Sequence, residues 1–171
     1  MGGISTDDAA AVDRLLDETA LAGDSLGGIV ECRCTDVPVG LGEPFFDSLE
    51  SLLSHALFSI PGIRGVEFGD GFAAARMKGS EHNDPFIDAA GHTARNGAGG
   101  INGGIANGNP IVLRVAVKPT SSIRKTQQTF DFTHGRMTGF SVPGRHDVCF
   151  ALRVPPVVEA VTACVLADLI L

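Results

Sequence analysis

The sequence contains no tryptophan and no tyrosine, and it has few positive charges. Its 171 residues include 13 Lys and Arg against 20 Asp and Glu, which gives a formal net charge of -7. Nucleic-acid backbones are bound by clustered Lys and Arg, and bases stack on aromatic rings. We therefore expect no nucleic-acid partner, whereas a small anionic ligand held by a few local cations remains compatible with the composition.

Long apolar runs and closely paired cysteines are also missing. No stretch reaches the ~20 apolar residues of a membrane-spanning helix, and the acidic start MGGISTDDAA lacks the positive charges of a secretory or transit signal. We expect a cytoplasmic protein with no membrane contact. The four cysteines form no CxxC pair, so small buried thiols are favoured over a metal site.

The composition is that of one globular domain. With 44% hydrophobic and 19% charged residues, the chain is long enough for one substantial core and too short for two ordinary domains. We expect residues 1–171 to form a single domain. The polar, glycine-rich stretch at 78–109 does not divide it, because neither flank is large enough to fold alone.

Apolar residues at helical spacing predict three helices. The first is capped by Ser5 or Thr6, the second covers residues 44–59 with the pair Phe45–Phe46 on its apolar stripe, and the third covers residues 157–171. Strands are predicted between them, together with a polar ribbon at 122–136; the strands are 29–37, 65–68, 72–77 and 111–117. Since Gly69-Asp70-Gly71 reads as a tight hairpin turn, we predict an α+β fold with long helices packed against an antiparallel sheet.

Two segments carry polar groups suited to a ligand. The run NGAGGINGGIANGNP, residues 96–110, matches neither a dinucleotide fingerprint nor a P-loop, and taken alone it favours a flexible loop. The segment KPTSS, Lys118 to Ser122, follows a predicted buried strand directly. Its ammonium group, hydroxyls and turn N–H groups suit a phosphate or a polar ring, although an ordinary strand exit is equally compatible.

Two further clusters gather ionisable side chains. GSEHNDPF, residues 79–86, would need additional ligands to hold a metal, and a solvated loop is favoured. GRHDVC, residues 144–149, is the stronger candidate. Arg145 offers a planar, forked cation for an anion, and Asp147 can accept a proton. A salt-bridged turn is the alternative interpretation of these residues.

The ordered set of segments resembles the chorismate synthase family. The resemblance is carried by GDSLGGIVE, VPVGLGEPFFDSL, SIPGIRGVEFGDGFAAARMKGSEHNDPF, NGAGGINGGIANGNPIVLRVAVKPTSSI, GRHDVCFALRVPPVVEA and VLADLIL. It implies a β-α-β sandwich of which this chain is half of the usual protomer. It also implies a carbon–oxygen lyase that eliminates phosphate from 5-enolpyruvylshikimate 3-phosphate to give chorismate, within the shikimate pathway of aromatic amino acid biosynthesis.

The resemblance further implies reduced FMN as cofactor, NADP as an associated nucleotide, and a homotetramer. It assigns flavin contacts to nine residues: Pro61, Gly62, Gly103, Lys118, Pro119, Thr120, Ser121, Ser122 and Arg145. It makes Asp147 the catalytic carboxylate, acting with the flavin, and it implies no metal ligand.

Only the C-terminal half of the family sequence is matched. The family's two catalytic histidines and its substrate-phosphate arginines belong to the other half, and the surroundings of His82, His92 and His134 do not match those motifs. Two interpretations therefore stay open. The chain is the C-terminal portion of a chorismate synthase that needs a separate N-terminal half chain, or it is a catalytically incompetent fragment acting as a flavin-binding or oligomerisation module.

Overall fold

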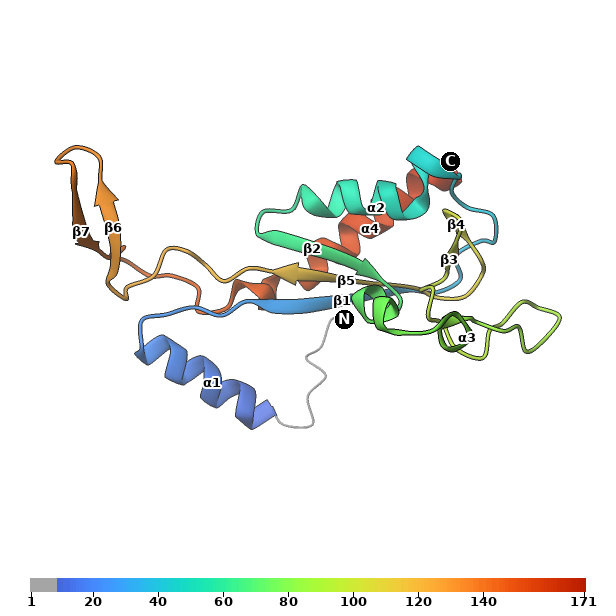
Figure 1. Cartoon of the computed structure of the whole chain (residues 1–171), viewed down its shortest axis with the longest axis horizontal. Coiled ribbons are helices and arrows are strands. Elements are labelled where there is room, and N and C mark those ends of the chain that lie inside the picture. Colours follow the sequence, from blue (N-terminus) through green and yellow to red (C-terminus); the bar gives the residue numbers. More distant parts are fainter. Residues whose placement is uncertain (1–8) are drawn as a thin grey trace.

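Three antiparallel strands form the central sheet of the computed structural model, which describes residues 9–171; the predicted cap at Ser5 or Thr6 lies outside them. The strands are β1 (Gly28–Cys34), β5 (Ile111–Val117) and β2 (Ile63–Phe68), in the order β1-β5-β2 (Figure 1). β5 alternates buried and more exposed residues, as expected of a strand with one face on the core. Its last residue, Val117, pairs with Gly28 and with Ile63, so β5 ends where β1 and β2 begin.

Two helices cover one face of this sheet. α2 (Leu49–Phe58) and α4 (Pro155–Ile170) lie against each other in Figure 1, and both contact the strands. The largest fully buried side chains come from these helices and from β5: Leu49, Leu53, Leu57, Ile111, Leu113, Val115, Val158 and Thr162. By contrast, α1 (Ala9–Leu21) buries no residue. The predicted α+β class and the antiparallel pairing are confirmed.

The prediction of one helix over residues 44–59 is wrong at its start. A 3-10 helix spans Phe45–Asp47, and α2 begins only after Ser48, whose Oγ accepts a hydrogen bond from the N–H of Ser51 at 3.1 Å. Phe45 has a positive φ of 68°, and the exposed fractions of Phe45 and Phe46 are 87% and 92%. The side-chain cap at Ser48 fixes the helix start and leaves both rings outside the core.

The predicted hairpin at Gly69-Asp70-Gly71 is also wrong. Residues Gly71–Arg76 form a 3-10 helix, and β2 pairs with β5 instead. The turn's N–H groups are bound elsewhere, because Gly69 donates to Val112 O at 2.9 Å and Asp70 donates to Gly97 O at 2.7 Å. Two of the three N–H groups of that turn are thus bound to other segments and do not close a two-stranded hairpin.

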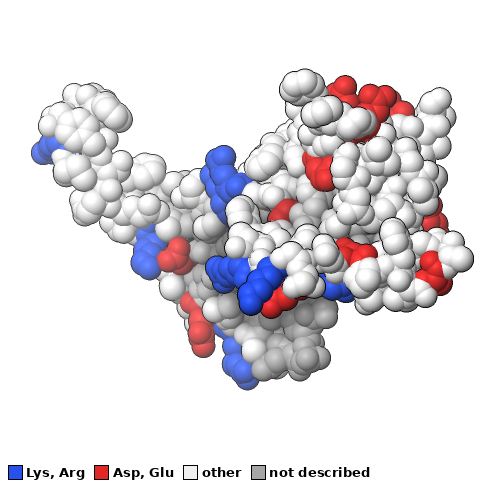
Figure 2. Space-filling model, turned by 45° about the vertical axis from the view of Figure 1, so that its right-hand side comes forward, with Lys and Arg blue, Asp and Glu red and all other residues white. Residues whose placement is uncertain are grey.

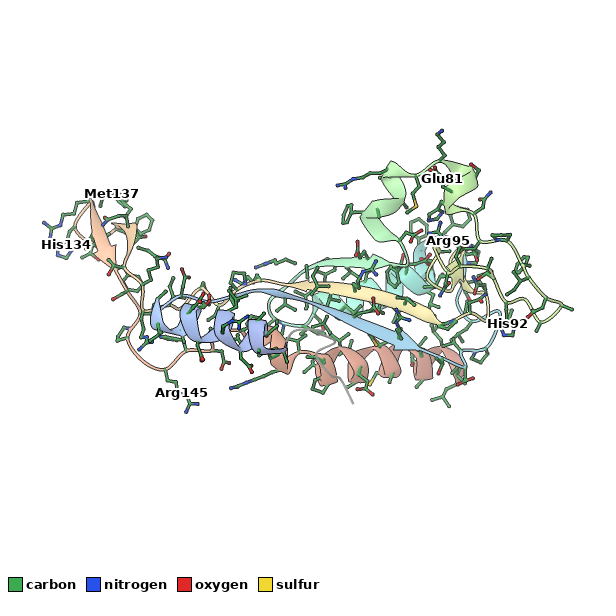
Figure 3. The ribbon with its side chains drawn as sticks, turned by 90° about the horizontal axis from the view of Figure 1, so that it is seen from below. Glu81, His92, Arg95, His134, Met137 and Arg145 are labelled. Carbon is green, nitrogen blue, oxygen red and sulfur yellow. The ribbon has the colours of Figure 1, made fainter. Side chains whose placement is uncertain are left out.

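The glycine-rich stretch is tied to the body by side chains. It contains α3 (Gly79–His82), β3 (Ile101–Asn102) and β4 (Ile105–Ala106). Asp84 accepts hydrogen bonds from the N–H groups of Gly97 and Ala98, both at 2.8 Å. Arg95 lies beneath Glu81 in Figure 3 and donates to the Glu81 carbonyl and to the Asp70 carboxylate. The start of the run 96–110, predicted as a flexible loop, is thus hydrogen-bonded to Asp84.

The predicted polar ribbon is a two-stranded arm. β6 (Gln127–Asp131) and β7 (Arg136–Phe140) pair with each other and project away from the body (Figure 1). Lys and Arg side chains gather where the arm joins the body, whereas Asp and Glu are spread over the body itself (Figure 2).

Candidate functional site

Three segments meet at the end of the sheet where β5 stops and β1 starts. The Ser25 hydroxyl donates a hydrogen bond to Thr120 O at 2.6 Å, and the N–H of Leu26 donates to Val148 O at 2.7 Å. These bonds join the start of β1, the KPTSS segment after β5 and the GRHDVC turn. We call the surface that they form, with Pro61-Gly62, the strand-end site.

Pro61-Gly62 reaches the same site through the start of β2. The N–H of Lys118 donates to Gly62 O at 2.9 Å. Gly62 has a φ of +91°, and a Cβ added there would lie 2.3 Å from the ring of Phe150. Glycine is therefore required at this position both for its backbone conformation and for the close approach of the aromatic ring.

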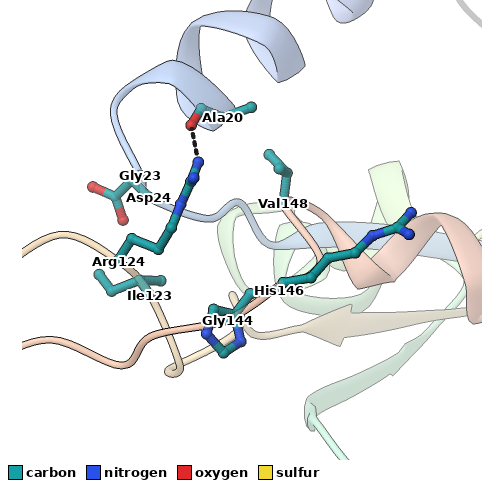
Figure 4. Close-up of a pocket in the computed structure, with 9 residues that line it drawn as sticks. Ala20, Gly23, Asp24, Ile123, Arg124, Gly144, His146 and Val148 are labelled. Atoms are coloured by element: carbon teal, nitrogen blue, oxygen red, sulfur yellow. Dashed lines mark hydrogen bonds between the residues drawn. The ribbon is translucent and has the colours of Figure 1, made fainter.

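Two hollows open on the strand-end site. One, of about 410 Å³, is bordered by Gly23, Arg124, Arg145 and His146 (Figure 4). The other, of about 290 Å³, is bordered by the segment 118–121. Asp24 and Ile123 line both hollows, so the two adjoin. Together they offer room for a ligand larger than either hollow alone.

Three cations of the site, Lys118, Arg124 and Arg145, form no ion pair with residues 9–171, and Arg124 donates to the Ala20 carbonyl instead. Lys125 Nζ lies 2.9 Å from Asp24 Oδ2, and this hydrogen bond, with one from the Ser25 N–H, holds the pKa of Asp24 below its usual range. Arg145 points away from the ribbon in Figure 3. The arrangement suits an anionic ligand.

The remaining ionisable groups of GRHDVC are engaged within the chain. His146 Nε2 lies 3.2 Å from Val142 O, and Asp147 Oδ1 forms an ion pair with Arg153 Nη2 at 2.9 Å. Arg145, His146 and Val148 border the larger hollow, whereas Asp147 does not. The salt-bridged turn that sequence reasoning kept as the alternative is thus present at Asp147, while Arg145 stays free of it.

Gly103 lies at the opposite end of the sheet. It forms the turn between β3 and β4, next to Gly104, whose carbonyl accepts from the N–H of Leu49 at 2.9 Å. The same loop joins the first half of β5, since Val112 N–H donates to Gly99 O at 3.1 Å. β5 separates the two ends by roughly 20 Å at ~3.4 Å per residue. One chain therefore does not bring Gly103 to Lys118 (Figure 1).

Comparison with known proteins decides the family. A family model described as chorismate synthase matches residues 3–171. The chain belongs to the chorismate synthase family. It is 63% identical over 156 residues to the chorismate synthase of Chitinophaga pinensis and 51% identical over 162 residues to that of Opitutus terrae.

These matches cover most of this chain and less than half of each relative. The shares are 91% of this chain and 47% of the Chitinophaga pinensis protein, and 94% and 44% for Opitutus terrae. A crystal structure of chorismate synthase superposes with a TM-score of 0.76 at 32% identity, covering 95% of this chain and 42% of that one. The fold described above is thus a chorismate synthase fold over about half the relatives' length.

Sequence reasoning missed Asp24, Ser25 and Arg124 as parts of the site. Asp24 lines both hollows, Ser25 ties the two strand ends together, and Arg124 Nη2 donates to Ala20 O at 3.0 Å (Figure 4). The sequence signal was GDS, residues 23–25, a glycine followed by two polar residues just before a predicted strand. In the structure that glycine has a φ of +68°.

Two further kinds of site can be checked in residues 9–171. Within that range no three His, Cys, Asp or Glu side chains lie together as metal ligands would. Asp84, from the GSEHNDPF segment, is occupied by two backbone N–H groups instead. No helix in the same range is long and apolar enough to cross a membrane.

Proposed function

We propose that this chain forms the C-terminal half of a chorismate synthase, a lyase that eliminates phosphate from 5-enolpyruvylshikimate 3-phosphate to give chorismate. Membership of the family over residues 3–171 supports the reaction. The observation that carries the proposal is that Lys118 and Arg145, which form no ion pair with residues 9–171, lie at two adjoining hollows of the strand-end site. A flavin phosphate or a reduced, anionic ring would supply the missing negative charge.

The residues of the strand-end site fit reduced FMN. Pro61-Gly62 and the segment 118–122 present backbone, hydroxyl groups and an ammonium group on one surface, because Lys118 is hydrogen-bonded to Gly62. Arg145 borders the larger hollow on its other side. When bound, reduced FMN supplies the electron-rich ring on which the family's reaction depends.

The chain's own residues would bind and polarise that cofactor. Lys118 and Arg145 place fixed positive charge beside an anion, in a geometry already held by the Ser25–Thr120 hydrogen bond. Thr120, Ser121 and Ser122 offer hydroxyl donors. Asp147 is the proposed proton acceptor, and Arg153 Nη2 lies 2.9 Å from its Oδ1.

Gly103 would act in the site of a second chain. It lies at the far end of the sheet from Lys118, and it has open space around its Cα with a φ of +61°. Backbone of this kind permits close approach of a planar ring. If Gly103 contacts flavin, that flavin is bound mainly by a neighbouring copy, which favours the homotetramer implied by the family resemblance.

The remaining properties belong to the whole enzyme. We propose that residues 1–171 act as one domain, that the other half of the relatives' length supplies the substrate-phosphate site, and that the assembled enzyme is cytoplasmic and associates with NADP. The share of each relative that this chain covers, 47% and 44%, supports the need for such a complement.

Binding and turnover can be tested separately. The chain is titrated with reduced FMN under anaerobic conditions, and chorismate formation is then assayed with and without the N-terminal half of the Chitinophaga pinensis relative. We expect flavin binding by the chain and turnover only in the complemented sample. Arg145→Ala should weaken flavin binding, whereas Arg136→Ala, a cation on the projecting arm, should not.

Three outcomes would count against parts of the proposal. Flavin binding without turnover in the complemented sample would favour a binding module that catalyses nothing. Unchanged affinity in Arg145→Ala would remove the strand-end site as the flavin site. Unchanged affinity in Gly103→Ala, with a tetramer present, would remove the role of the second chain.

A further inference from the structure

Two cysteine side chains lie together between β1 and α4, away from the strand-end site. Cys32 and Cys34 are separated by one residue on β1, so both point to the helix-covered face of the sheet. The two side chains are close enough for each thiol to shift the pKa of the other, lowering that of Cys32 and raising that of Cys34. Both are only partly buried, on a strand that lies at the edge of the three-stranded sheet. The sulfur pair is therefore reachable from outside the chain.

An unpartnered hydroxyl on α4 faces this pair. Thr162 has a relative exposure of 1%, and its Oγ1 forms no hydrogen bond in the structure. Its polar neighbour is Cys32, and the Thr162 hydroxyl can donate a hydrogen bond to the Cys32 sulfur when that sulfur is a thiolate. A buried hydroxyl without a partner costs free energy, so a state that supplies a charged acceptor is favoured. Glu159, one turn earlier on α4, adds a negative charge close to both sulfurs.

The geometry argues against a disulfide between the two cysteines. Residues two apart on a strand have Cα atoms about 6.4–6.8 Å apart, at the upper limit for a disulfide. Their Cβ atoms point the same way and stay similarly separated, whereas a disulfide brings Cβ atoms to roughly 3.8 Å. Two thiols that project side by side from one strand can instead both ligate one metal ion bound between them.

We propose that Cys32 and Cys34 form a chelating dithiolate site for a soft, monovalent metal ion of the Cu(I) class, with Thr162 donating a hydrogen bond to the Cys32 sulfur. Soft ions prefer thiolates, and two sulfur ligands satisfy Cu(I), whereas structural zinc sites need four ligands. Binding forms two S–Cu bonds, displaces to the buffer the protons that the two thiols still carry at the working pH, and changes no oxidation state. Glu159 favours the incoming cation.

The test uses the reduced full chain under anaerobic conditions, with Cu(I) as the probe in competition with a coloured Cu(I) chelator. We expect one Cu(I) per chain, and a loss of affinity of at least tenfold in Cys32→Ser and in Cys34→Ser. Cys164→Ser is the matched control, because Cys164 is an exposed cysteine on α4. Equal losses in all three variants, or none in the first two, would overturn the site.

Two further measurements keep the proposal testable if a cysteine variant fails to fold. X-ray absorption at the copper edge of the wild-type complex should show two sulfur neighbours, and nitrogen neighbours from histidine would refute the assignment. Thr162→Val should retain the fold and weaken Cu(I) binding about tenfold or more, because it removes a hydrogen bond to a charged group. Unchanged Cu(I) affinity in that variant would exclude the role of Thr162.

Discussion

The N–H of Lys118 donates a hydrogen bond to the carbonyl oxygen of Gly62, with N and O 2.9 Å apart. This bond continues the antiparallel pairing of β5 with β2 by one residue beyond Val117 and Ile63. It makes the turn before one strand and the turn after another a single surface. The cofactor contacts proposed for Pro61-Gly62 and for the KPTSS segment therefore depend on the same local backbone.

Replacing Gly62 with alanine should lower the free energy of unfolding by more than the strain of its left-handed backbone alone would. Gly62→Ala places a methyl group 2.3 Å from the Phe150 ring at a φ of +91°, whereas Gly40→Ala has a φ of +92° and open space. We expect Gly40→Ala to lower the free energy of unfolding by about 1–2 kcal/mol through the left-handed backbone. Gly62→Ala should cost about 1–3 kcal/mol more through overpacking. Urea unfolding followed by circular dichroism measures both, and equal losses would contradict the role of Phe150.

Arg95 should hold the glycine-rich stretch against the body. Its guanidinium contacts Asp70, the Glu81 carbonyl and, at 3.8 Å, Asp84, whose side chain is 8% exposed. Arg95→Ala leaves these acceptors without their cation, so we expect the free energy of unfolding to fall by about 1–3 kcal/mol. Amide hydrogen exchange at Gly97 and Ala98 should accelerate, because Asp84 binds both N–H groups.

Arg33→Ala is the matched control for Arg95. Arg33 pairs with Glu31 at 2.7 Å, but its side chain is 68% exposed, and exposed ion pairs contribute little. We expect a change within about 0.5 kcal/mol and unaltered exchange at Gly97 and Ala98. Accelerated exchange in both arginine variants would show that Arg95 has no special role.

The parts of the fold that the sequence predicted are those with strong local patterns. β5 was expected at 111–117 and lies there, because its alternate residues are buried in the core. The final helix was expected from 157 and begins at Pro155. The strand expected at 72–77 is a 3-10 helix instead. Its turn binds Val112 and Gly97, contacts from distant segments that no local pattern reveals.

Parts of the candidate site could also be predicted from the sequence. The sequence KPTSS predicted that polar residues follow β5. The GRHDVC turn meets that segment through the start of β1, which is hydrogen-bonded to both. The separation of Gly103 from Lys118 followed from the same prediction, although the resemblance assigned both to one flavin site. Gly103 precedes β5 and Lys118 follows it, so a seven-residue strand keeps the two at opposite ends.

Thr162→Val should stabilise the chain. The hydroxyl of Thr162 is buried without a hydrogen bond, so an isosteric methyl group removes an unsatisfied polar atom from the core. We expect the free energy of unfolding to rise by about 1–3 kcal/mol at a pH well below 7, where Cys32 is protonated and offers Thr162 no charged acceptor. Thr19→Val is the control, because Thr19 is also helical but its Oγ1 donates to Leu15 O at 2.7 Å. A gain in Thr19→Val as large as in Thr162→Val would show that the effect is not burial of an unpaired hydroxyl.

Cys32 should react as a thiolate at neutral pH. A hydrogen bond from the Cys34 thiol lowers the pKa of Cys32 to about 7, against the opposing effect of burial, and the same contact raises the pKa of Cys34. The rate of Cys32 alkylation by iodoacetamide should therefore rise as the pH passes through about 7 and level off above it, since the thiolate is the nucleophile.

The matched variant removes the donor. In Cys34→Ala the alkylation midpoint of Cys32 should move up toward the ~8.5 of an ordinary thiol. Peptide mass spectrometry after timed alkylation resolves Cys32 from Cys164 in the same digest, so Cys164 serves as an internal reference for reagent reactivity. A midpoint for Cys32 that is the same in both proteins would show that Cys34 does not control its ionisation. A shift in the variant requires the two thiols to interact in solution.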